Sequence, residues 1–147
     1  IIGIHHTALR KRTFYRVDFV FFTAVTDLDN GVFKDCTKLV TVDFLPGSTI
    51  TLLPGEAFKG CTSLTTINIP DTVTHIGMNY SNYVFEGCTS LVTISIPNSV
   101  THIGRGAFKD CTSLITINYS GSEADWNKII IEEGNESLNQ AKIIFNN

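Results

Sequence analysis

The chain repeats one seven-residue motif four times, and no other feature constrains its fold as strongly. Each copy reads Phe-x-x-Cys-Thr-x-Leu, and successive copies start 25, 27 and 23 residues apart. The copies span residues 33–39, 58–64, 85–91 and 108–114. Self-similarity at this period is typical of stacked supersecondary units, each of which packs only against its neighbours. The sequence therefore predicts a repeat solenoid, not a globular domain built around a buried catalytic pocket.

The residues after each motif predict a β-strand. In the second copy, Leu64 is followed by Ile67 and Ile69, and a polar residue, Asn68, separates the last two. This alternation has the period of a strand that is buried on one face. Pro70 ends the segment, because proline cannot donate a hydrogen bond to a sheet. The equivalent strands are expected within residues 39–44, 64–69, 91–96 and 114–119.

A second, shorter extended segment follows in each coil. It reads Val-Thr-His-Ile-Gly at 73–77 and 100–104, and more loosely Ile-Thr-Leu-Leu at 50–53. We expect this segment on the opposite side of the coil from the first strand. Gly77 and Gly104 are expected to permit the turn that follows, because glycine adopts unusual backbone angles without strain.

Inward-pointing residues are expected to stack on their counterparts one coil away. The aromatic residue of each motif then forms a spine through Phe58, Phe85 and Phe108. In the second coil the inward set consists of Phe58, Leu64, Ile67, Ile69, Val73 and Ile76.

The cysteines recur at one position of the repeat, which decides how we interpret them. They are Cys36, Cys61, Cys88 and Cys111. This is not the C-x-x-C spacing of a zinc site or a redox motif. Stacked identical side chains point the same way and bridge poorly. We therefore expect free thiols that pack as small apolar groups, in preference to disulfides.

The complete repeat resembles the BspA-like subfamily of leucine-rich repeats, found in bacterial and protozoan surface proteins. The spacing L-x-x-I-x-I runs through the strand segment, and I-P-N-S-V-T-H-I-G-R-G-A-F-K-D-C-T-S-L at 96–114 matches almost position for position. The resemblance covers residues 16–119. It implies a right-handed, mainly β coil, with short parallel strands on a concave face and second short strands on the other side.

The repeat fades toward the N terminus. In residues 1–15, Leu9 takes the place of the motif phenylalanine and Arg12 that of the cysteine. We interpret this segment as a degenerate or truncated repeat, and we expect the N terminus to be cut from a longer chain. In the first full coil, Asp18 and Val20 are expected at the start of the two outward columns of the sheet.

Residues 120–147 depart from the repeat and are predicted to form a C-terminal cap of a helix and a strand. Ser122 suits a helix N-cap, with acidic residues in the first turn. The expected apolar helical face consists of Trp126, Ile129 and Ile130. Gly134 is expected to end the helix, and 141–145 to form a closing strand. The stretch G-S-E-A-D-W-N-K resembles the BspA-like C-terminal cap. We therefore expect Trp126 to cover the last apolar layer of the core. We also expect the C terminus to be the natural end of the protein.

Composition and motifs weigh against several functions. The net charge of −3 gives no electrostatic case for nucleic acid or an anionic membrane, and no apolar run reaches the roughly 18 residues that span a bilayer. The sequence holds no nucleophile elbow, zinc-protease, phosphate-loop or dinucleotide motif, so we expect no enzyme and no cofactor. His75 and His102 are expected one strand spacing apart. Because no third ligand recurs with them, we interpret them as a polar column, not a metal site.

The outward positions of the predicted main strands are candidate contacts for a partner. One column consists of Thr41, Thr66, Thr93 and Thr116, and a second of Asp43, Asn68, Ser95 and Asn118. Horseshoe-shaped repeat proteins expose such columns as a broad binding surface. The alternative is that threonine is present for strand propensity and solubility, since the columns lack tryptophan, tyrosine and arginine.

The third coil carries four extra residues before its motif. Met78, Tyr80 and Tyr83 lie in this insertion. Insertions in solenoids map to loops on one edge, and exposed apolar side chains there form a plausible contact patch. The alternative is that Tyr83 replaces the alanine before the motif phenylalanine and points inward.

The family resemblance implies an extracellular or cell-surface, non-catalytic adhesion module that recognises host or cell-surface proteins or glycans. We expect a monomer that binds no nucleic acid and does not insert into a membrane. The alternative is a structural spacer in a larger surface protein, with no ligand of its own. A third hypothesis is a glycan-recognising accessory module, for which Tyr80 and Tyr83 matter most.

Overall fold

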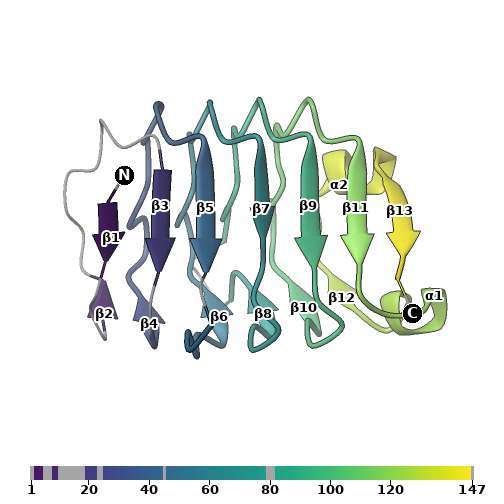
Figure 1. Ribbon diagram of the computed structural model, residues 1–147. Coiled ribbons are helices and arrows are strands. Elements are labelled where there is room, and N and C mark those ends of the chain that lie inside the picture. Colours follow the sequence, from purple (N-terminus) through teal and green to yellow (C-terminus); the bar gives the residue numbers. More distant parts are fainter. Residues whose placement is uncertain are drawn as a thin grey trace.

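The chain winds as a right-handed solenoid with parallel strands (Figure 1). The computed structural model describes residues 2–4, 8–9, 19–22, 25–44, 46–78 and 82–146. Each coil runs down one strand of a long sheet, crosses to a short strand on the opposite side, and returns through a turn segment. The predicted leucine-rich-repeat-like coil, mainly β with two sets of short strands, is confirmed.

The first side of the coil is a seven-stranded parallel sheet, which we call the main sheet. Its strands, in spatial order, are β1 (Ile2–Ile4), β3 (Phe19–Phe22), β5 (Thr41–Phe44), β7 (Thr66–Asn68), β9 (Thr93–Ile96), β11 (Thr116–Tyr119) and β13 (Lys142–Phe145). Thr66 is the register partner of both Thr41 and Thr93, and Thr93 is that of Thr116. The predicted strands and the closing strand therefore form, and equivalent residues of successive coils lie side by side.

The second side carries the shorter strands. A four-stranded parallel sheet contains β6 (Leu52–Leu53), β8 (His75–Ile76), β10 (His102–Ile103) and β12 (Ile130–Ile131), while β2 (Ala8–Leu9) pairs with β4 (Asp27–Leu28). The predicted second segments are confirmed. Strand β12 was not predicted, because Ile130 was expected on a helix.

The third side is built from the seven-residue motifs, which form turns with their own hydrogen-bond ladder. The Phe33 N–H donates to Ala57 O at 2.8 Å, and the Phe58 N–H donates to Val84 O at 2.9 Å. Here the N–H of one coil points to the carbonyl of the next. Gly60 fits this turn because its φ is +72° and a Cβ would lie 2.4 Å from the Asp35 carboxylate. Consecutive coils are thus joined on all three sides.

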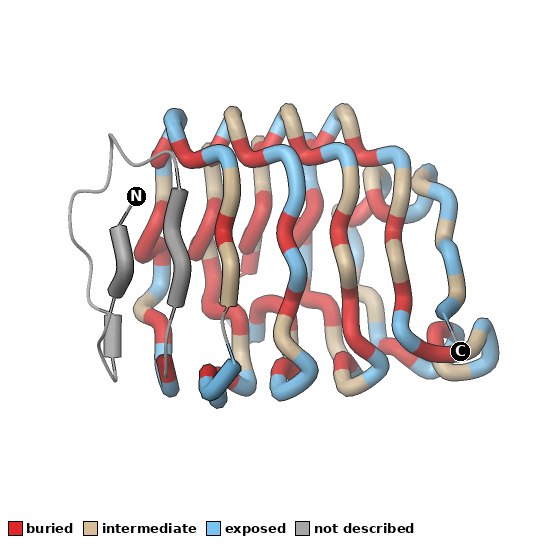
Figure 2. The backbone as a smooth tube through the Cα atoms, viewed as in Figure 1, coloured by how far each residue is buried: buried red, intermediate tan, exposed pale blue. Residues whose placement is uncertain are grey.

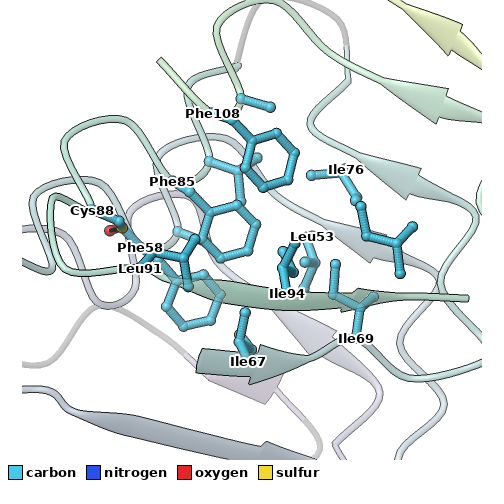
Figure 3. Packing of buried hydrophobic residues seen from close by; sticks show 14 of the residues in the cluster. Leu53, Phe58, Ile67, Ile69, Ile76, Phe85, Cys88, Leu91, Ile94 and Phe108 are labelled. Carbon is cyan, nitrogen blue, oxygen red and sulfur yellow. Dashed lines mark hydrogen bonds between the residues drawn. The ribbon is translucent and has the colours of Figure 1, made fainter. Parts of the chain in front are cut away.

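The core is a stack of like residues from successive coils (Figure 3). The predicted aromatic spine is confirmed and begins one coil earlier, at Phe33. Ring centroids are 5.5 Å apart for Phe33–Phe58, 5.3 Å for Phe58–Phe85 and 5.2 Å for Phe85–Phe108. The rings are nearly parallel, within the range of favourable stacked pairs. The inward set predicted for the second coil is entirely buried.

The cysteines are buried free thiols, as predicted, and they also link the coils. The Cys61 thiol donates to Phe33 O, and the Cys88 thiol donates to Phe58 O, each at 3.1 Å. Cys111 repeats the contact with Phe85 O. Each of these three thiols therefore acts as a weak donor to the preceding coil as well as an apolar filler.

Two expectations for the N-terminal coils are wrong in register. Phe19 is the register partner of Thr41, and Phe21 that of Asp43, so Val20 does not start an outward column. The run Phe-Val-Phe-Phe has no polar alternation to mark its faces, which is why sequence alone misplaced it by one residue. Leu9 pairs with Leu28 in the second-strand position instead of replacing a motif phenylalanine. Asp18 and Arg12 lie outside the described residues.

A further expectation, about the turn glycines, holds for only one of them. Gly77 has a φ of +73°, whereas Gly104 has no positive φ. At Gly104 the requirement is space: a Cβ there would lie 2.4 Å from Asn82 Oδ1 and 3.3 Å from the Gly77 carbonyl carbon. The inserted residues of the third coil, to which Asn82 belongs, create this crowding.

The C-terminal segment is a modified coil and not a plain helix followed by a strand. Helix α1 (Glu123–Trp126) begins at Ser122, whose hydroxyl accepts the Asp125 N–H in a capping box, as the sequence predicted in part. The helix lasts one turn and ends at Asn127, and two residues later three β-branched isoleucines begin, which suit a strand. Ile130 lies in β12 and is 63% exposed, so the predicted apolar face is wrong at that residue.

The end of the core is covered from two directions. Trp126 is buried and meets the Tyr119 ring edge-on at 5.1 Å, which confirms its predicted capping role. A second helix, α2 (Glu136–Gln140), follows Gly134 and was not predicted. Its Leu138 is buried in the same core.

Candidate binding surface

The eight residues predicted as partner contacts lie on the outer face of the main sheet. The residues between them, Val42, Ile67, Ile94 and Ile117, are 1% exposed or less. The predicted residues themselves are exposed or half-buried, so each strand alternates between core and surface (Figure 2). Asn68, Ser95 and Asn118 are register partners, and Asp43 holds the same place in β5. The structure thus places both predicted columns together.

A third column on this face was missed by the sequence analysis. It precedes the strands and consists of Val40, Thr65, Val92 and Ile115. Backbone hydrogen bonds align it, from Thr65 N–H to Val40 O, from Val92 N–H to Thr65 O and from Ile115 N–H to Val92 O. The exposed fraction is 40% for both valines and 62% for Ile115. The position directly after each motif leucine carried the signal, because three of its four residues are aliphatic.

We call these three columns together the main-sheet face. Its polar columns run through β5, β7, β9 and β11, and its aliphatic column lies along their N-terminal ends. In β13 the face continues with Lys142, and Ile144 there is 38% exposed. The face therefore combines hydrogen-bonding groups with an exposed apolar stripe.

The insertion residues are not equivalent. Met78 is 39% exposed, whereas Tyr83 is half-buried with the Lys59 ammonium 5.4 Å from its ring centroid. A Cβ on Gly106 would lie 2.6 Å from the Tyr83 ring, so the ring also packs on that glycine. Tyr80 lies outside the described residues.

The alternative prediction, that Tyr83 replaces the alanine before the motif phenylalanine and points inward, is wrong. Val84 directly precedes Phe85 and takes the place of the alanine. Tyr83 is equivalent instead to Gly106: the Tyr83 N–H donates to Arg105 O, and the Gly106 N–H donates to Glu133 O. Its φ of +63° is shared with that glycine position. The tyrosine therefore fills the space above a neighbouring glycine instead of entering the core.

The turn side carries an alternating chain of charges. It runs through Lys34, Glu56, Lys59, Glu86 and Lys109, with nitrogen–oxygen distances of 2.6–3.3 Å. The hydrogen bond from Lys34 lowers the pKa of Glu56, and the hydrogen bond to Glu86 raises the pKa of Lys59. Exposed pairs of this kind contribute little stability, about 0–1 kcal/mol each. Three lysines and two glutamates leave this chain of charges with a net charge of only +1, so it offers little field to attract a charged partner.

The predicted histidine column forms. His75 and His102 are register partners with ring centroids 5.8 Å apart. Strand β12 brings Glu132 to 3.0 Å from His102 Nε2, a carboxylate that sequence reasoning did not place there. Across the described ranges, no group of three or more histidine, cysteine or acidic side chains is arranged to hold a metal ion.

A model of a known repeat family matches this sequence. The model for the BspA type leucine rich repeat region matches residues 7–134, with six copies. The chain belongs to the BspA-type leucine-rich repeat family. Members of this repeat class and their structural neighbours are generally non-catalytic, and the fold is one used for protein interaction or as a surface module.

Three solved structures of leucine-rich proteins share the fold. A leucine-rich cell surface protein from Faecalibacterium prausnitzii A2-165 is 35% identical, with a TM-score of 0.77 over 88% of this chain. A leucine-rich repeat protein from T. pallidum is 30% identical, with a TM-score of 0.64 over 92% of this chain. A third, from Bacteroides ovatus ATCC 8483, is 26% identical, with a TM-score of 0.71 over 98%.

The BspA-type chain spans only part of these proteins. It covers 34% of the F. prausnitzii chain, 63% of the T. pallidum chain and 41% of the B. ovatus chain. A search of the curated proteins gives no match. Among the described residues, no helix has the length and apolar character that a membrane crossing requires.

Proposed function

We propose that this BspA-type chain is a surface-exposed, non-catalytic recognition module that binds a protein partner through the main-sheet face. The observation that carries this proposal is the aliphatic column, in which Val40, Val92 and Ile115 stay exposed in line. Isolated exposed apolar residues are common, but an aligned row beside polar groups is a feature of interaction sites.

The form of the face supports this function. Ladder hydrogen bonds and the buried row beneath fix the backbone of the outward residues, so little backbone entropy is lost on binding. Successive coils present equivalent side chains at about 4.8 Å intervals, which suits an extended partner segment. The column of Asp43, Asn68, Ser95 and Asn118 supplies donors and acceptors for specificity. A protein is favoured over a glycan on this face because the apolar stripe needs an apolar counterpart.

The finer parts of the proposal concern location and partner. The F. prausnitzii relative is named a cell surface protein, which supports an extracellular or cell-surface location for this chain. From there, adhesion to a host or cell-surface protein is the role we propose. The insertion residues Met78, Tyr80 and Tyr83 would add a second contact at the edge, with Met78 the exposed one among those described.

A matched pair of substitutions tests the proposal. Ile115 and Ile130 are the same residue type with 62% and 63% exposure, but Ile130 lies on the second sheet. The purified domain and the variants Ile115→Lys and Ile130→Lys would be titrated by biolayer interferometry against immobilised extracellular-matrix proteins and glycans. We expect saturable binding to a protein that Ile115→Lys weakens about tenfold or more, with Ile130→Lys close to wild type.

Two outcomes would contradict this function. Equal effects of Ile115→Lys and Ile130→Lys would remove the main-sheet face from the binding site. A panel without any signal, for a domain whose folding is confirmed by circular dichroism, would favour the spacer hypothesis and move the search for a ligand to other parts of the parent protein.

A further inference from the structure

A cavity of about 280 Å³ lies where the last full coil meets the cap, and its lining includes residues at the end of β11 and in α1. It is far along the chain from the insertion and is separate from the aliphatic column. Its lining consists of Asn98, Val100, Thr101, Tyr119, Asp125, Lys128 and Ile129. The cavity forms because the chain after β11 leaves the repeat and turns into α1 instead of making another short turn.

Tyr119 is the residue that suggests a use for this cavity. It occupies a core column whose neighbouring register partners, Ile96 and Phe145, carry no polar side-chain atom. Tyr119 is 1% exposed, and its hydroxyl makes no hydrogen bond with any residue that the structure describes. Phenylalanine would pack equally well there. The hydroxyl is not among the buried side-chain atoms that lack a partner, so it opens onto the cavity, where water or a ligand can pair with it.

The groups around the hydroxyl define the chemistry that fits. Burial raises the pKa of Tyr119, the Asp125 carboxylate raises it further, and the Lys128 ammonium lowers it, so the phenol oxygen lies within electrostatic range of both charges. Those two charges neutralise each other through a 2.8 Å ion pair. The lining thus offers donors and acceptors without a net charge.

We propose that this cavity, which we call the cap cavity, binds one neutral sugar residue. The hydroxyl groups of a sugar match the phenol of Tyr119 and the amide of Asn98, which can each donate and accept. The hydroxyl of Thr101 donates to Thr74 O at 3.2 Å and remains available as an acceptor. The aliphatic side chains of Val100 and Ile129 offer an apolar surface for the C–H face of the ring. The volume lies near the lower end of ligand pockets, which fits one pyranose and excludes a long chain lying inside.

A zwitterionic amino acid is the main competitor, and the structure disfavours it. It would have to separate the Asp125–Lys128 pair, and Asp125 also accepts the Ser122 hydroxyl at 2.6 Å. Both interactions hold the first turn of α1 in place. A neutral ligand leaves them intact.

The test uses the whole chain and a single-atom change. Methyl glycosides of common hexoses and N-acetylhexosamines, with glycine betaine as the zwitterionic control, would be titrated against the ¹⁵N-labelled protein by NMR. We expect saturable shifts at residues 98–101 and 119–129 with at least one glycoside, and none with betaine. Tyr119→Phe removes only the hydroxyl and should weaken binding about three- to tenfold with an unchanged spectrum elsewhere.

Controls separate the sources of the sugar and the two proposals. Tyr83→Phe, the same change outside the cavity, should bind like wild type. A disaccharide that carries the same terminal sugar should bind at least as well if the natural ligand is the end of a glycan, and worse if it is a free monosaccharide. Equal binding by Tyr119→Phe, or no glycoside shift up to high millimolar concentration, would overturn the proposal. Ile115→Lys leaves the cap cavity intact, so it should lose protein binding but keep sugar binding. The proposal for the main-sheet face and the proposal for the cap cavity can therefore fail independently.

Discussion

The side-chain carbonyl of Asn135 accepts the backbone N–H of Phe108 at 3.0 Å and so completes the turn-side ladder of the solenoid. In the preceding coil the Phe85 N–H donates to the backbone carbonyl of Ala107. The modified C-terminal coil that follows Phe108 has no copy of the seven-residue motif, and the side chain of its Asn135 supplies the acceptor that a backbone carbonyl provides in the earlier coils. The amide group of Asn135 donates in turn to Gly104 O and Glu132 O, and the residue is 2% exposed.

We therefore expect Asn135→Leu to destabilise the domain by about 2–4 kcal/mol, since three hydrogen bonds are lost and their buried partners stay unpaired. Urea unfolding followed by circular dichroism measures this change. Asn139→Leu is the matched control, because Asn139 is exposed in the same helix. If the two variants unfold at the same urea concentration, the side-chain cap does not contribute as its geometry indicates.

The aromatic spine supports a second prediction. Phe85 is fully buried between Phe58 and Phe108, and truncation to alanine opens a cavity in the middle of the stack. We expect Phe85→Ala to cost about 3–5 kcal/mol, against a total stability of roughly 5–15 kcal/mol for a domain. The melting temperature checks this, with the half-exposed Val92→Ala as control. A melting temperature near that of the wild type would show that the stack is not the core that holds the coils together.

Sequence reasoning located these coils because each constraint recurs. Phe58, Phe85 and Phe108 are separated by nearly constant spacings, and each is followed by the same alternating strand, so period and burial face agree at every copy. The register failed in β3, where four apolar residues in a row left both faces alike, and in β2, where Leu9 pairs with Leu28. The structure of the interior coils can thus be predicted well from a repeated sequence, whereas that of the terminal coils is predicted poorly.

The parts of the site that were missed depend on contacts between segments without a repeat. Glu132 reaches His102, and Asn135 reaches Phe108, only because the segment after α1 rejoins both sheets. Neither residue occupies a repeat position. Ile115 was missed for a different reason: it precedes the strand proper, and alternation alone does not show that its side chain is exposed.

Crowding at Gly104 gives a third prediction. It distinguishes a steric requirement for glycine at this position from a requirement for a positive φ. Because a Cβ at Gly104 would meet Asn82 Oδ1 at 2.4 Å while φ is not positive, Gly104→Ala should cost about 1–3 kcal/mol through overpacking. In an Asn82→Ala background the cost of Gly104→Ala should fall by more than half, which a double-mutant cycle measures. A cost that is the same in both backgrounds would place the strain elsewhere.

The buried thiols predict that the domain loses stability at alkaline pH. Burial, followed by the Asp35 charge, raises the pKa of Cys36 to about 11, and burial raises the pKa of Cys111 to about 12. Burial also raises the pKa values of Cys61 and Cys88 above the ordinary 9.0. Above about pH 9 the unfolded chain releases thiol protons that the folded chain retains. Stability is therefore full below pH 9 and falls as pH rises toward the folded pKa values, by at most about 1.4 kcal/mol per pH unit for each thiol.

A single substitution isolates this effect from other groups that titrate in the same range. Serine does not ionise there, and at position 88 its hydroxyl can still donate to Phe58 O, which the Cys88 thiol contacts at 3.1 Å. Urea unfolding between pH 8 and pH 10.5 should give Cys88→Ser a shallower decline than wild type, by about 1.4 kcal/mol per pH unit at the steepest point. Parallel declines for the two proteins would mean that the Cys88 thiol ionises as readily in the folded stack as in the unfolded chain.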